Sequence, residues 1–416
     1  MRSPILVALD PRSCPLLRPL LAYGLLAVPI LCSGLSRNTE SRIHATEPKP
    51  TDDVAAVAAS EKDWPLFRGD VQARGARERS LPEPLDLLWK FETPDTQFEG
   101  SAAIVDGVVY IGDMNGVIRA IGLHDGKVRW EKKDEQSESG FSTTPAVRDG
   151  RLFLGNLDGQ FYGRRTDTGA LIWKFSATSE INSSANFYKD GVLFGSQDAN
   201  LYYLNVQNGD LIWKFTIEDQ IRCSPTVVED RAFVAGCDSR LHMVDLTNGK
   251  GAASVPIDSP TGVTAAAHGD RVFFGTEGGA VHAINWRKAE SDWVFRDEPN
   301  RQSIRSSPAV QSGLVITGSR SKRIYALDEQ TGEKRWMFSA QARVDGSPVV
   351  AGQRVYIGAA NGRLFALHLN TGKVAWEYET GGEIVASPAV ADGRLVIANT
   401  DGTIYCFGDQ QGDGGQ

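Results

Sequence analysis

Seven tryptophans recur along this chain at an almost constant interval. They are Trp89, Trp130, Trp173, Trp213, Trp293, Trp336 and Trp376. The gaps are 41, 43, 40, 80, 43 and 40 residues, and the gap of 80 is two intervals of 40 because Ala253 stands where another tryptophan would be. A fixed period of about 20 to 50 residues is the signature of a repeat architecture. We therefore expect an array of similar structural units.

Each repeat contains three turn signals, which divide it into four short stretches of alternating or apolar residues. A clear example runs from Val344 to Trp376, with the sequence VDGSPVVAGQRVYIGAANGRLFALHLNTGKVAW. Across the units, Asp-Gly, Asn-Gly and Thr-Gly pairs supply glycines for the positive φ of tight hairpins. This pattern predicts four antiparallel strands per unit. The tryptophan in the fourth strand is expected to pack between neighbouring units.

The number of repeats predicts how the chain closes on itself. Starts of the first strand are expected at Phe98, Phe141, Ile181, Ile221, Thr261, Ile304, Val344 and Ile384. The eighth unit stops after three strands and has no tryptophan, whereas Leu87–Phe91 has the fourth-strand pattern upstream of the first full unit. The sequence thus predicts an all-β, eight-bladed β-propeller of four-stranded antiparallel blades, whose N-terminal strand completes the last blade. An open solenoid would need capping repeats, and none is visible.

The consensus of the repeats, SPAVxxGxVYxGxxxGxLxALxxxTGxxxW, resembles a known family. It is similar to the eight-bladed repeat of pyrroloquinoline quinone (PQQ) dehydrogenases and of BamB, an outer-membrane protein assembly factor with that fold and no cofactor. The resemblance covers Trp64 to about Gly408, and Asp63–Asp70 is similar to the family's lead-in. WD40 units instead end in Trp-Asp and carry Gly-His. The resemblance implies the propeller fold and leaves the function open, because many functions share propellers.

The N-terminus indicates export. Arg2, Arg12 and Arg18 precede an apolar run, Pro19–Cys32, which is too short and too broken by proline for a comfortable membrane span. Cleavage near Cys32, lipidation of Cys32 and an uncleaved anchor remain alternatives. We expect a periplasmic or other cell-envelope location. The predicted segments are a signal or anchor (1–34), a flexible linker (35–62), the propeller (63–408) and a disordered tail (409–416).

The net charge limits the kinds of partner to expect, and the positions of the cysteines indicate whether a disulfide forms. The formal net charge is −8 without long runs of one sign, which argues against nucleic acid as a partner. A monomer is expected. Cys223 and Cys237 fall on neighbouring strands, but the turn at Glu229-Asp230 sets them one residue out of step. Free thiols are therefore favoured over a disulfide, which stays the alternative in an oxidising compartment.

The sequence offers few residues for catalysis. In the quinoprotein dehydrogenases that the chain resembles, the quinone lies against a tryptophan and often an adjacent cysteine pair, and calcium needs six to eight oxygen ligands. This chain is much shorter and has no Cys-Cys pair. Trp286, outside the tryptophan period, is the candidate stacking ring, but packing in an irregular fifth unit is the favoured interpretation. We predict no catalytic residue, metal or cofactor, with PQQ and Ca²⁺ as the alternative.

A candidate site appears where the repeats differ from one another. The residue after each first-strand start is polar and varied: Glu99, Ser142, Asn182, Arg222, Gly262, Arg305, Asp345 and Val385. A packing position would be uniformly apolar. Since first strands line the channel of a propeller, these rim residues are expected around one mouth of the channel, with Glu99 and Asn182 among them. Solvated residues without a function are the alternative interpretation.

The resemblance adds a partner-binding role for part of this rim. In BamB-like proteins, the surface that holds the barrel-assembly protein uses Leu-x-Leu-Arg in one blade and Asp-x-Asp in the next. The sixth unit here has Ser303-Ile304-Arg305 and the seventh has Arg343-Val344-Asp345, so Arg305 and Asp345 match while Arg343 and Ser303 depart. Arg222 matches the arginine position in another unit. The predicted partner-binding residues are Arg222, Ile304, Arg305, Val344 and Asp345, with the two apolar side chains as contact core.

A cluster of cations accompanies the sixth unit. Arg320, Lys322 and Arg323, together with Arg305 and Arg343, predict a locally basic face, for which an ordinary solvated cluster is the alternative. Taken with the resemblance, the sequence favours a non-catalytic cell-envelope scaffold that binds envelope proteins, a barrel-assembly component among the candidates. The membrane would be contacted only through the N-terminus. A quinoprotein-type dehydrogenase and a ligand-sensing propeller are the alternatives.

Overall fold

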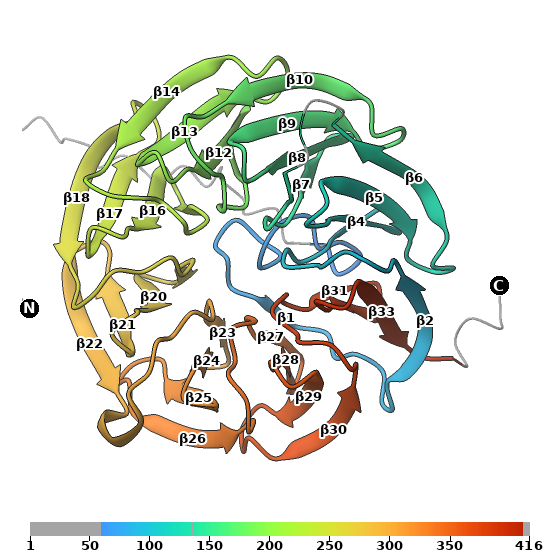
Figure 1. Ribbon diagram of the computed structural model, residues 1–416. Helices are drawn as coiled ribbons and strands as arrows, with labels where there is room; N and C mark the ends of the chain where they lie inside the picture. Colours follow the sequence, from blue (N-terminus) through green and yellow to red (C-terminus); the bar gives the residue numbers. More distant parts are fainter. Residues whose placement is uncertain (1–59, 135–136, 138, 411–416) are drawn as a thin grey trace, which may run out of the picture. The chain divides into compact units, whose positions relative to one another are not determined.

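The computed structural model describes residues 60–134, 137 and 139–410, which form a ring of eight four-stranded blades (Figure 1). The predicted signal or anchor (1–34), with Cys14 and Cys32, lies outside the described residues, as do most of the linker and of the tail. Within the described part the single helical element is a 3-10 turn, Glu298–Asn300, and no helix there is long and apolar enough to cross a membrane. The predicted all-β propeller is confirmed.

The first four blades have the same order, from the inner strand at the channel to the outer strand at the periphery. Blade 1 contains β3 (Ala103–Val105), β4 (Val108–Gly112), β5 (Val117–Gly122) and β6 (Val128–Lys133); blade 2, β7 (Ala146–Arg148), β8 (Arg151–Gly155), β9 (Gln160–Arg165) and β10 (Leu171–Ser176); blade 3, β11 (Asn186–Tyr188), β12 (Gly191–Gly195), β13 (Asn200–Asn205) and β14 (Leu211–Thr216); blade 4, β15 (Thr226–Val228), β16 (Arg231–Ala235), β17 (Arg240–Asp245) and β18 (Lys250–Pro256).

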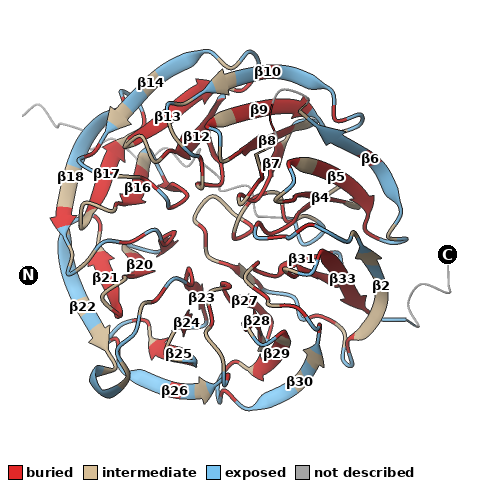
Figure 2. Ribbon diagram, viewed as in Figure 1, coloured by how far each residue is buried: buried red, intermediate tan, exposed pale blue. Residues whose placement is uncertain are grey.

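The remaining blades continue this order. Blade 5 contains β19 (Ala266–His268), β20 (Arg271–Gly275), β21 (Ala280–Asn285) and β22 (Glu290–Arg296); blade 6, β23 (Ala309–Gln311), β24 (Leu314–Ser319), β25 (Arg323–Asp328) and β26 (Lys334–Ser339); blade 7, β27 (Val349–Ala351), β28 (Arg354–Gly358), β29 (Arg363–His368) and β30 (Val374–Glu379); blade 8, β31 (Ala389–Ala391), β32 (Arg394–Ala398) and β33 (Thr403–Gly408). The inner and middle strands are buried and the outer strands are exposed (Figure 2).

The ring closes through a strand from the N-terminal side of the chain. β2 (Asp86–Glu92) pairs antiparallel with β33 and supplies the fourth strand of blade 8, with Lys90 opposite Tyr405. Trp89 of β2 donates its indole N–H to the Leu123 carbonyl oxygen of blade 1 at 2.8 Å. The closing strand therefore contacts the blade on either side of the seam, and the predicted closure is confirmed.

The inner strands begin later than the sequence predicted. In blade 6 the expected start was Ile304, whereas β23 begins at Ala309. The intervening backbone turns to the next blade instead of joining its own sheet: the Ser307 N–H donates to the Ser347 hydroxyl oxygen at 2.9 Å, and Pro308 has no N–H to give. The rim residues consequently lie on short loops that lead into the inner strands.

Six of the seven periodic tryptophans pack against the glycine turn of the following blade. Trp173 donates its indole N–H to the Val206 carbonyl oxygen of blade 3 at 3.1 Å. Gly209 in that turn has φ +76°, and a Cβ there would lie 2.7 Å from the Trp173 ring. The same contact links Trp130 to Gly169 and Trp213 to Gly249. The Thr-Gly and Trp positions of the repeat are thus two halves of one inter-blade contact.

Blade 5 restores the contact that Ala253 cannot make. Trp286 comes from blade 5, is 8% exposed and packs in one cluster with Phe233 of blade 4 and with Ala253. The Phe233 and Trp286 ring centroids are 5.7 Å apart, and the indole N–H donates to the Gly269 carbonyl oxygen at 3.1 Å. Trp286 is therefore a packing residue, as the sequence favoured.

Residues 61–77, the lead-in segment, cross the channel and hydrogen-bond to the inner region of every blade. Its carbonyl oxygens accept N–H groups at one equivalent position in six blades: Ile104, Val147, Val227, Ala267, Val310 and Val350. Blade 3 contributes the Asn186 side-chain amide, on Val71, and blade 8 the Asp392 N–H, on Glu61. The segment ends in β1 (Ala76–Arg77), parallel to β27. One stretch of chain therefore spans the whole ring at one end of the channel.

In the described part of the chain, Cys223 and Cys237 are free thiols and do not form a disulfide with each other. Cys223 and Cys406 are buried. Burial raises the pKa of the Cys223 thiol to about 12, so the thiol stays protonated. The expectation of free thiols agrees with the structure.

Candidate functional site

All eight rim residues lie around one cavity at the mouth of the central channel. The cavity has a volume of about 160 Å³. Its walls hold Glu99, Ser142, Asn182, Arg222, Gly262, Arg305, Asp345 and Val385, one from each blade in order round the ring. Because each repeat forms one blade of the ring, residues that are far apart in the sequence meet at this cavity. We call this cavity and its rim the cup.

The two apolar residues predicted as contact core are not on this surface. Ile304 is 3% exposed and Val344 is 0% exposed. A Cβ on Gly275 would lie 2.1 Å from Ile304, and one on Gly318 would lie 2.3 Å from Val344, so both side chains are packed against glycines in the second strands, β20 and β24, of the preceding blades. They hold the rim loops in place, and their burial removes them from any docking surface.

Two of the charged rim residues, Arg305 and Asp345, form ion pairs within the protein. Arg305 pairs with Glu277 of blade 5, with Nε 2.8 Å from Oε1, and not with Asp345. Asp345 accepts two hydrogen bonds of 2.9 Å from Arg320 and one of 3.2 Å from Arg343. Such bidentate arginine–carboxylate contacts are charge-assisted and fix both side chains.

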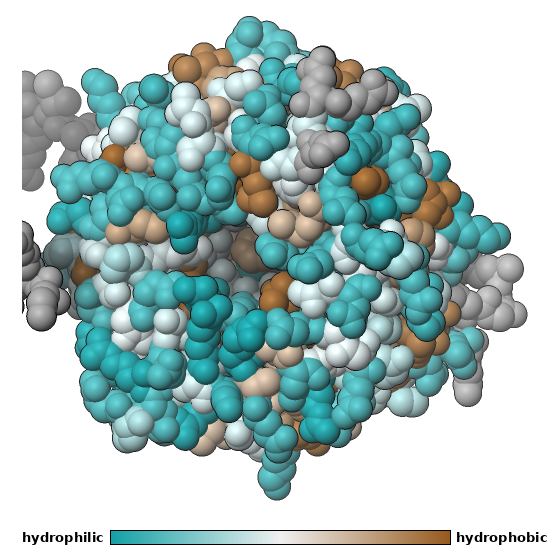
Figure 3. Space-filling model, viewed as in Figure 1, coloured by the Kyte–Doolittle hydropathy of each residue, from teal (hydrophilic) through white to brown (hydrophobic). Residues whose placement is uncertain are grey.

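The predicted basic face is therefore largely neutralised. Arg320 and Arg343 share Asp345, and Arg343 also pairs with Glu383 at 2.6 Å. Arg323 lies 3.3 Å from Asp297. The pairings with Asp297 and Glu383 could not be predicted from the sequence, because these acids come from adjacent blades. In the view of Figure 3, hydrophilic residues cover most of the visible face and hydrophobic ones are scattered among them.

Arg222 differs from the other rim cation. Its Nε donates to Gln220 Oε1 at 3.0 Å, and in the described part of the chain no carboxylate lies within ion-pair distance of it. The adjacent blade 5 has Gly262, where a Cβ would be 3.0 Å from the Arg222 Cβ. Arg222 and Arg305 thus stand on either side of a residue without a side chain, while Glu99 belongs to blade 1, opposite blade 5 in the ring.

Below the rim, eight hydroxyl groups form a closed hydrogen-bonded ring. In each blade a serine or threonine accepts the backbone N–H of the equivalent residue in the preceding blade, at 2.8 to 3.2 Å. The members, in order, are Ser101, Thr144, Ser184, Ser224, Thr264, Ser307, Ser347 and Ser387, whose N–H returns to Ser101. All eight also line the cup. This hydroxyl ring joins every blade to its neighbours without a break at the seam.

The lead-in segment supplies the floor of the cup through Phe67. The next residue, Arg68, is 1% exposed, and its Nη2 donates to the Pro308 carbonyl oxygen at 3.0 Å, beside Ser307 of the hydroxyl ring. Its Nε and Nη1 have no hydrogen-bond partner among the described residues. Burial lowers the pKa of the guanidinium to about 9, so the group remains a cation at neutral pH.

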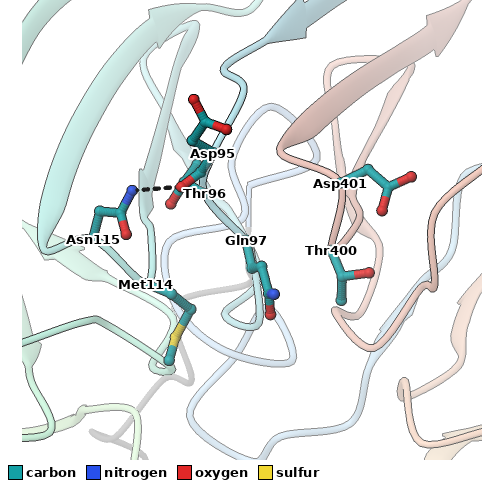
Figure 4. A pocket seen from close by; sticks show the side chains of 7 residues that line it. All are labelled: Asp95, Thr96, Gln97, Met114, Asn115, Thr400 and Asp401. Carbon is teal, nitrogen blue, oxygen red and sulfur yellow. Dashed lines mark hydrogen bonds between the residues drawn. The ribbon is translucent and has the colours of Figure 1, made fainter.

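A second cavity lies at the seam between blades 8 and 1. It has a volume of about 540 Å³ and is lined by Asp95, Thr96, Gln97, Met114, Asn115, Thr400 and Asp401 (Figure 4). Asn115 donates its side-chain N–H to the Asp95 carbonyl oxygen at 2.9 Å. The lining contains no aromatic ring on which a planar ligand would stack and no cation that would hold an acid.

Neither cavity has residues that fit a calcium ion and a quinone. Calcium takes six to eight oxygen ligands with converging carboxylates. Among the described residues, no three His, Cys, Asp or Glu side chains converge in this way. In the cup the nearest approach to such a set is Glu99 and Asp345, and Asp345 is already bound by two arginines. We derive no reaction step through these groups.

The comparisons with known proteins bear on the family. The family model described as "Outer membrane protein assembly factor BamB" matches residues 86–294 and 320–414. The chain belongs to this family. The BamB of Escherichia coli K12 is 29% identical over 85 residues, which are 19% of this chain and 22% of that protein. That alignment thus spans less than a quarter of the curated relative's length.

Two solved structures show the same fold. The BamB of Moraxella catarrhalis has a TM-score of 0.67 at 17% identity and covers 78% of this chain and 100% of its own. The quinohemoprotein alcohol dehydrogenase of Comamonas testosteroni has a TM-score of 0.71 at 15% identity and covers 85% of this chain and 82% of its own. Likeness at such low identity establishes the BamB-family fold and not an activity.

Sequence reasoning found the rim but missed the hydroxyl ring and the floor. The serine or threonine recurred in every repeat, and that regularity was the signal for a shared role. Its partners, however, lie one repeat away, so no local pattern revealed the bonds. The role of Phe67 and Arg68 depends on where the lead-in segment crosses the channel, which its own sequence does not specify.

Proposed function

We propose that this protein is a non-catalytic scaffold of the cell envelope that binds partner proteins through the channel-mouth face, in the assembly of outer-membrane proteins. Membership of the BamB family supports this role. The observation that carries it is the rim: eight blades of one repeat place eight different residues around one mouth. A position that varies while its surroundings repeat is not set by packing, so its residues are available for a partner. Export and retention at the envelope, with lipidation at Cys32 as one route, belong to the same proposal.

The docking contacts we propose are polar. Arg222, Arg305 and Asp345 present charged groups, and Glu99 and Asn182 extend the rim. Arginines held by neighbouring carboxylates are preorganised, so less side-chain entropy is lost on binding. Arginine is enriched among the residues that dominate interface energies.

Reversal of rim charge tests the proposal. The full-length protein, tagged and expressed in the cells that make it, is captured from solubilised envelope as wild type, Arg305→Glu, Asp345→Arg and Arg129→Glu. Arg129 is a matched control because it is an exposed, ion-paired arginine on an outer strand. We expect a discrete partner whose recovery falls at least about tenfold in the two rim variants, an interface loss of about 1.4 kcal/mol or more. Equal recovery in all four proteins would contradict docking at the rim.

The enzyme alternative rests on the fold shared with the Comamonas dehydrogenase. It is tested by titrating the purified protein with PQQ and calcium while following tryptophan fluorescence and visible absorbance. We expect no saturable binding, because the cup is smaller than the roughly 300 to 1,000 Å³ typical of small-molecule pockets and the seam cavity has no stacking ring. Saturable micromolar binding of PQQ together with dye-linked oxidation of an alcohol would contradict the scaffold proposal.

A further inference from the structure

The base of the cup is lined by eight hydroxyl groups, one from each blade. Each of the eight hydroxyl oxygens accepts a backbone N–H, and within the described residues none of the eight O–H groups donates to another protein atom. Each hydroxyl therefore keeps its O–H hydrogen and one oxygen lone pair, and it can donate a hydrogen bond to an anion. Eight O–H donors from eight blades therefore line the wall of one small cavity.

Two guanidinium groups add positive charge on either side of these donors. Arg222 lies at the mouth without a carboxylate partner in the described chain. Arg68 lies next to the floor residue Phe67, is almost completely buried, and leaves Nε and Nη1 without partners among the described residues. Asp70 supplies some negative charge to this buried guanidinium, but two of its nitrogen atoms stay without hydrogen bonds, which is unfavourable for a buried ion. An anion in the cup would add negative charge near it.

The shape of the cup limits the size of that anion. A volume of about 160 Å³ holds a few waters or the end of one acidic side chain, and it is too small for a typical drug-sized ligand. The Arg222 side chain lies against Gly262, and Arg305 follows in the next blade, so blades 4 to 6 form the cationic side of the rim. Glu99, on the opposite side, disfavours a second negative charge there.

We propose that the cup binds a single carboxylate group, held by Arg222 and the hydroxyl ring, with Arg68 providing charge from below the floor. This inference deepens the proposed function, since the carboxylate of a glutamate or aspartate on a docked partner would fill the cup. A free carboxylate has the same chemistry. The experiment therefore includes one probe for each source.

The probes are ¹³C-labelled acetate and the peptide acetyl-Gly-Glu-Gly-amide, titrated into the full-length protein at constant pH and ionic strength and followed by NMR. The matching Gln peptide controls for contacts other than the carboxylate. We expect saturation by acetate and by the Glu peptide, with Kd on the order of 1 to 10 mM, and no saturation by the Gln peptide. Equal affinities indicate a site for free anions, whereas tighter binding of the peptide indicates a side-chain carboxylate.

Three variants assign the binding to the cup. Arg222→Gln should weaken acetate binding about tenfold or more, and Glu99→Gln should strengthen it about two- to fivefold because a like charge is removed. Lys322→Gln is the matched control: it removes one positive charge near the rim, at a residue that does not line the cavity. Its affinity should stay within about twofold of wild type. Arg222 is exposed, so its substitution leaves the core intact.

Two results would overturn the inference: no saturation of the wild type by either carboxylate probe, or an equal loss in Arg222→Gln and Lys322→Gln, which reveals general charge attraction. Either result leaves the scaffold proposal standing if capture of a partner still depends on Arg305 and Asp345. If carboxylates still bind but partner capture does not depend on Arg305 and Asp345, the scaffold proposal is contradicted and the anion site remains.

Discussion

At the scale of single residues, the contact between a glycine turn and a tryptophan explains why the repeat keeps its form along the chain. Gly249 has φ +71°, and a Cβ there would lie 2.6 Å from the Trp213 ring. Two separate demands, a left-handed backbone and a close approach, therefore act on one residue. Other turn glycines meet only the first demand, which allows the two effects to be separated.

Gly249→Ala should destabilise the protein more than Gly313→Ala. Gly313 has φ +75°, and a Cβ there would have no atom within 4 Å, so alanine incurs only the backbone cost of about 1–2 kcal/mol. Gly249→Ala adds overpacking against Trp213, about 1–3 kcal/mol more. Chemical denaturation of both variants gives the difference. Equal losses would show that the indole moves aside freely.

Trp286→Ala tests whether the Trp286 side chain stabilises the core or serves to stack against a ligand. As the side chain that fills the space beside Ala253, its truncation should cost about 3–5 kcal/mol of unfolding free energy, measured by denaturant titration. A change within about 0.5 kcal/mol, as for ordinary surface substitutions, would instead favour a ligand-stacking role.

The rim shows at residue level what the sequence could predict. Arg222, Arg305 and Asp345 were found because their column of the repeat was polar and varied, and all three line the cup. Their partners were not found: Glu277 and Arg320 come from other turns, and a pairing between blades leaves no trace in the sequence of one blade. Ile304 was assigned to the docking surface through the resemblance to the Leu-x-Leu-Arg stretch of BamB-like proteins, whereas Gly275 makes room for it to be buried.

At the scale of elements, adjacent blades are linked by titratable contacts as well as by packing. His268 of β19 and Glu329 after β25 join blades 5 and 6, with Nδ1 2.7 Å from Oε1. The hydrogen bond to Glu329 raises the pKa of His268 above its usual value. His282 behaves oppositely, because burial lowers its pKa despite a 2.8 Å contact with Asp258.

His268→Gln should remove one component of the pH dependence of stability. A histidine with a raised folded-state pKa contributes stability that is complete below the unfolded pKa of about 6.5 and is lost as pH rises through the folded pKa. The wild type should therefore exceed the variant by a few tenths of a kcal/mol at about pH 6, and less at about pH 8, since His268 is half-exposed. Both proteins retain His282, so its opposite contribution cancels. A gap that grows with pH would contradict the assignment.

The blades themselves were predictable because their signals are local. Turn glycines, alternating apolar residues and the tryptophan lie within about 40 residues of one another, so strands and blade number follow from pattern. The start of the inner strand was misplaced because the Ser307 N–H bonds to the next blade and Pro308 has no N–H for its own sheet. The partner of Ser307 lies in another repeat, so the pattern of one repeat does not reveal it. β2 was assigned correctly because Leu87–Phe91 carries the fourth-strand pattern.

At the scale of the whole molecule, closure is what makes eight similar units into one rigid ring. Three devices join the ring: β2 in blade 8, the hydroxyl ring, and the lead-in segment that bonds to every blade. The first and last parts of the propeller thus stabilise each other. A ring that opens at its seam would lose the pairing of β2 with β33 and the hydrogen bond from Ser387 to Ser101.

A disulfide across the seam should stabilise the protein more than the same disulfide inside a blade. Lys90 pairs with Tyr405 across the seam, and Lys214 pairs with Tyr202 at the equivalent position in blade 3. In chain-entropy terms, Lys90→Cys with Tyr405→Cys closes a far longer loop and should gain about 3 kcal/mol more than Lys214→Cys with Tyr202→Cys. Oxidised and reduced forms of each variant are compared by denaturation, which cancels the cost of losing tyrosine. Equal gains would indicate that the seam is already held closed in the unfolded ensemble.

The central claim is that the channel-mouth face holds a partner protein, and site-specific photo-crosslinking in living cells tests it most directly. A benzoylphenylalanine replaces Val385, a neutral rim residue, or Val128, which is 40% exposed on the outer strand β6. The account predicts a discrete protein adduct from position 385 that disappears when Arg305→Glu is added, and none from position 128. Adducts from position 128 alone, or an adduct at 385 that is indifferent to Arg305→Glu, would contradict it.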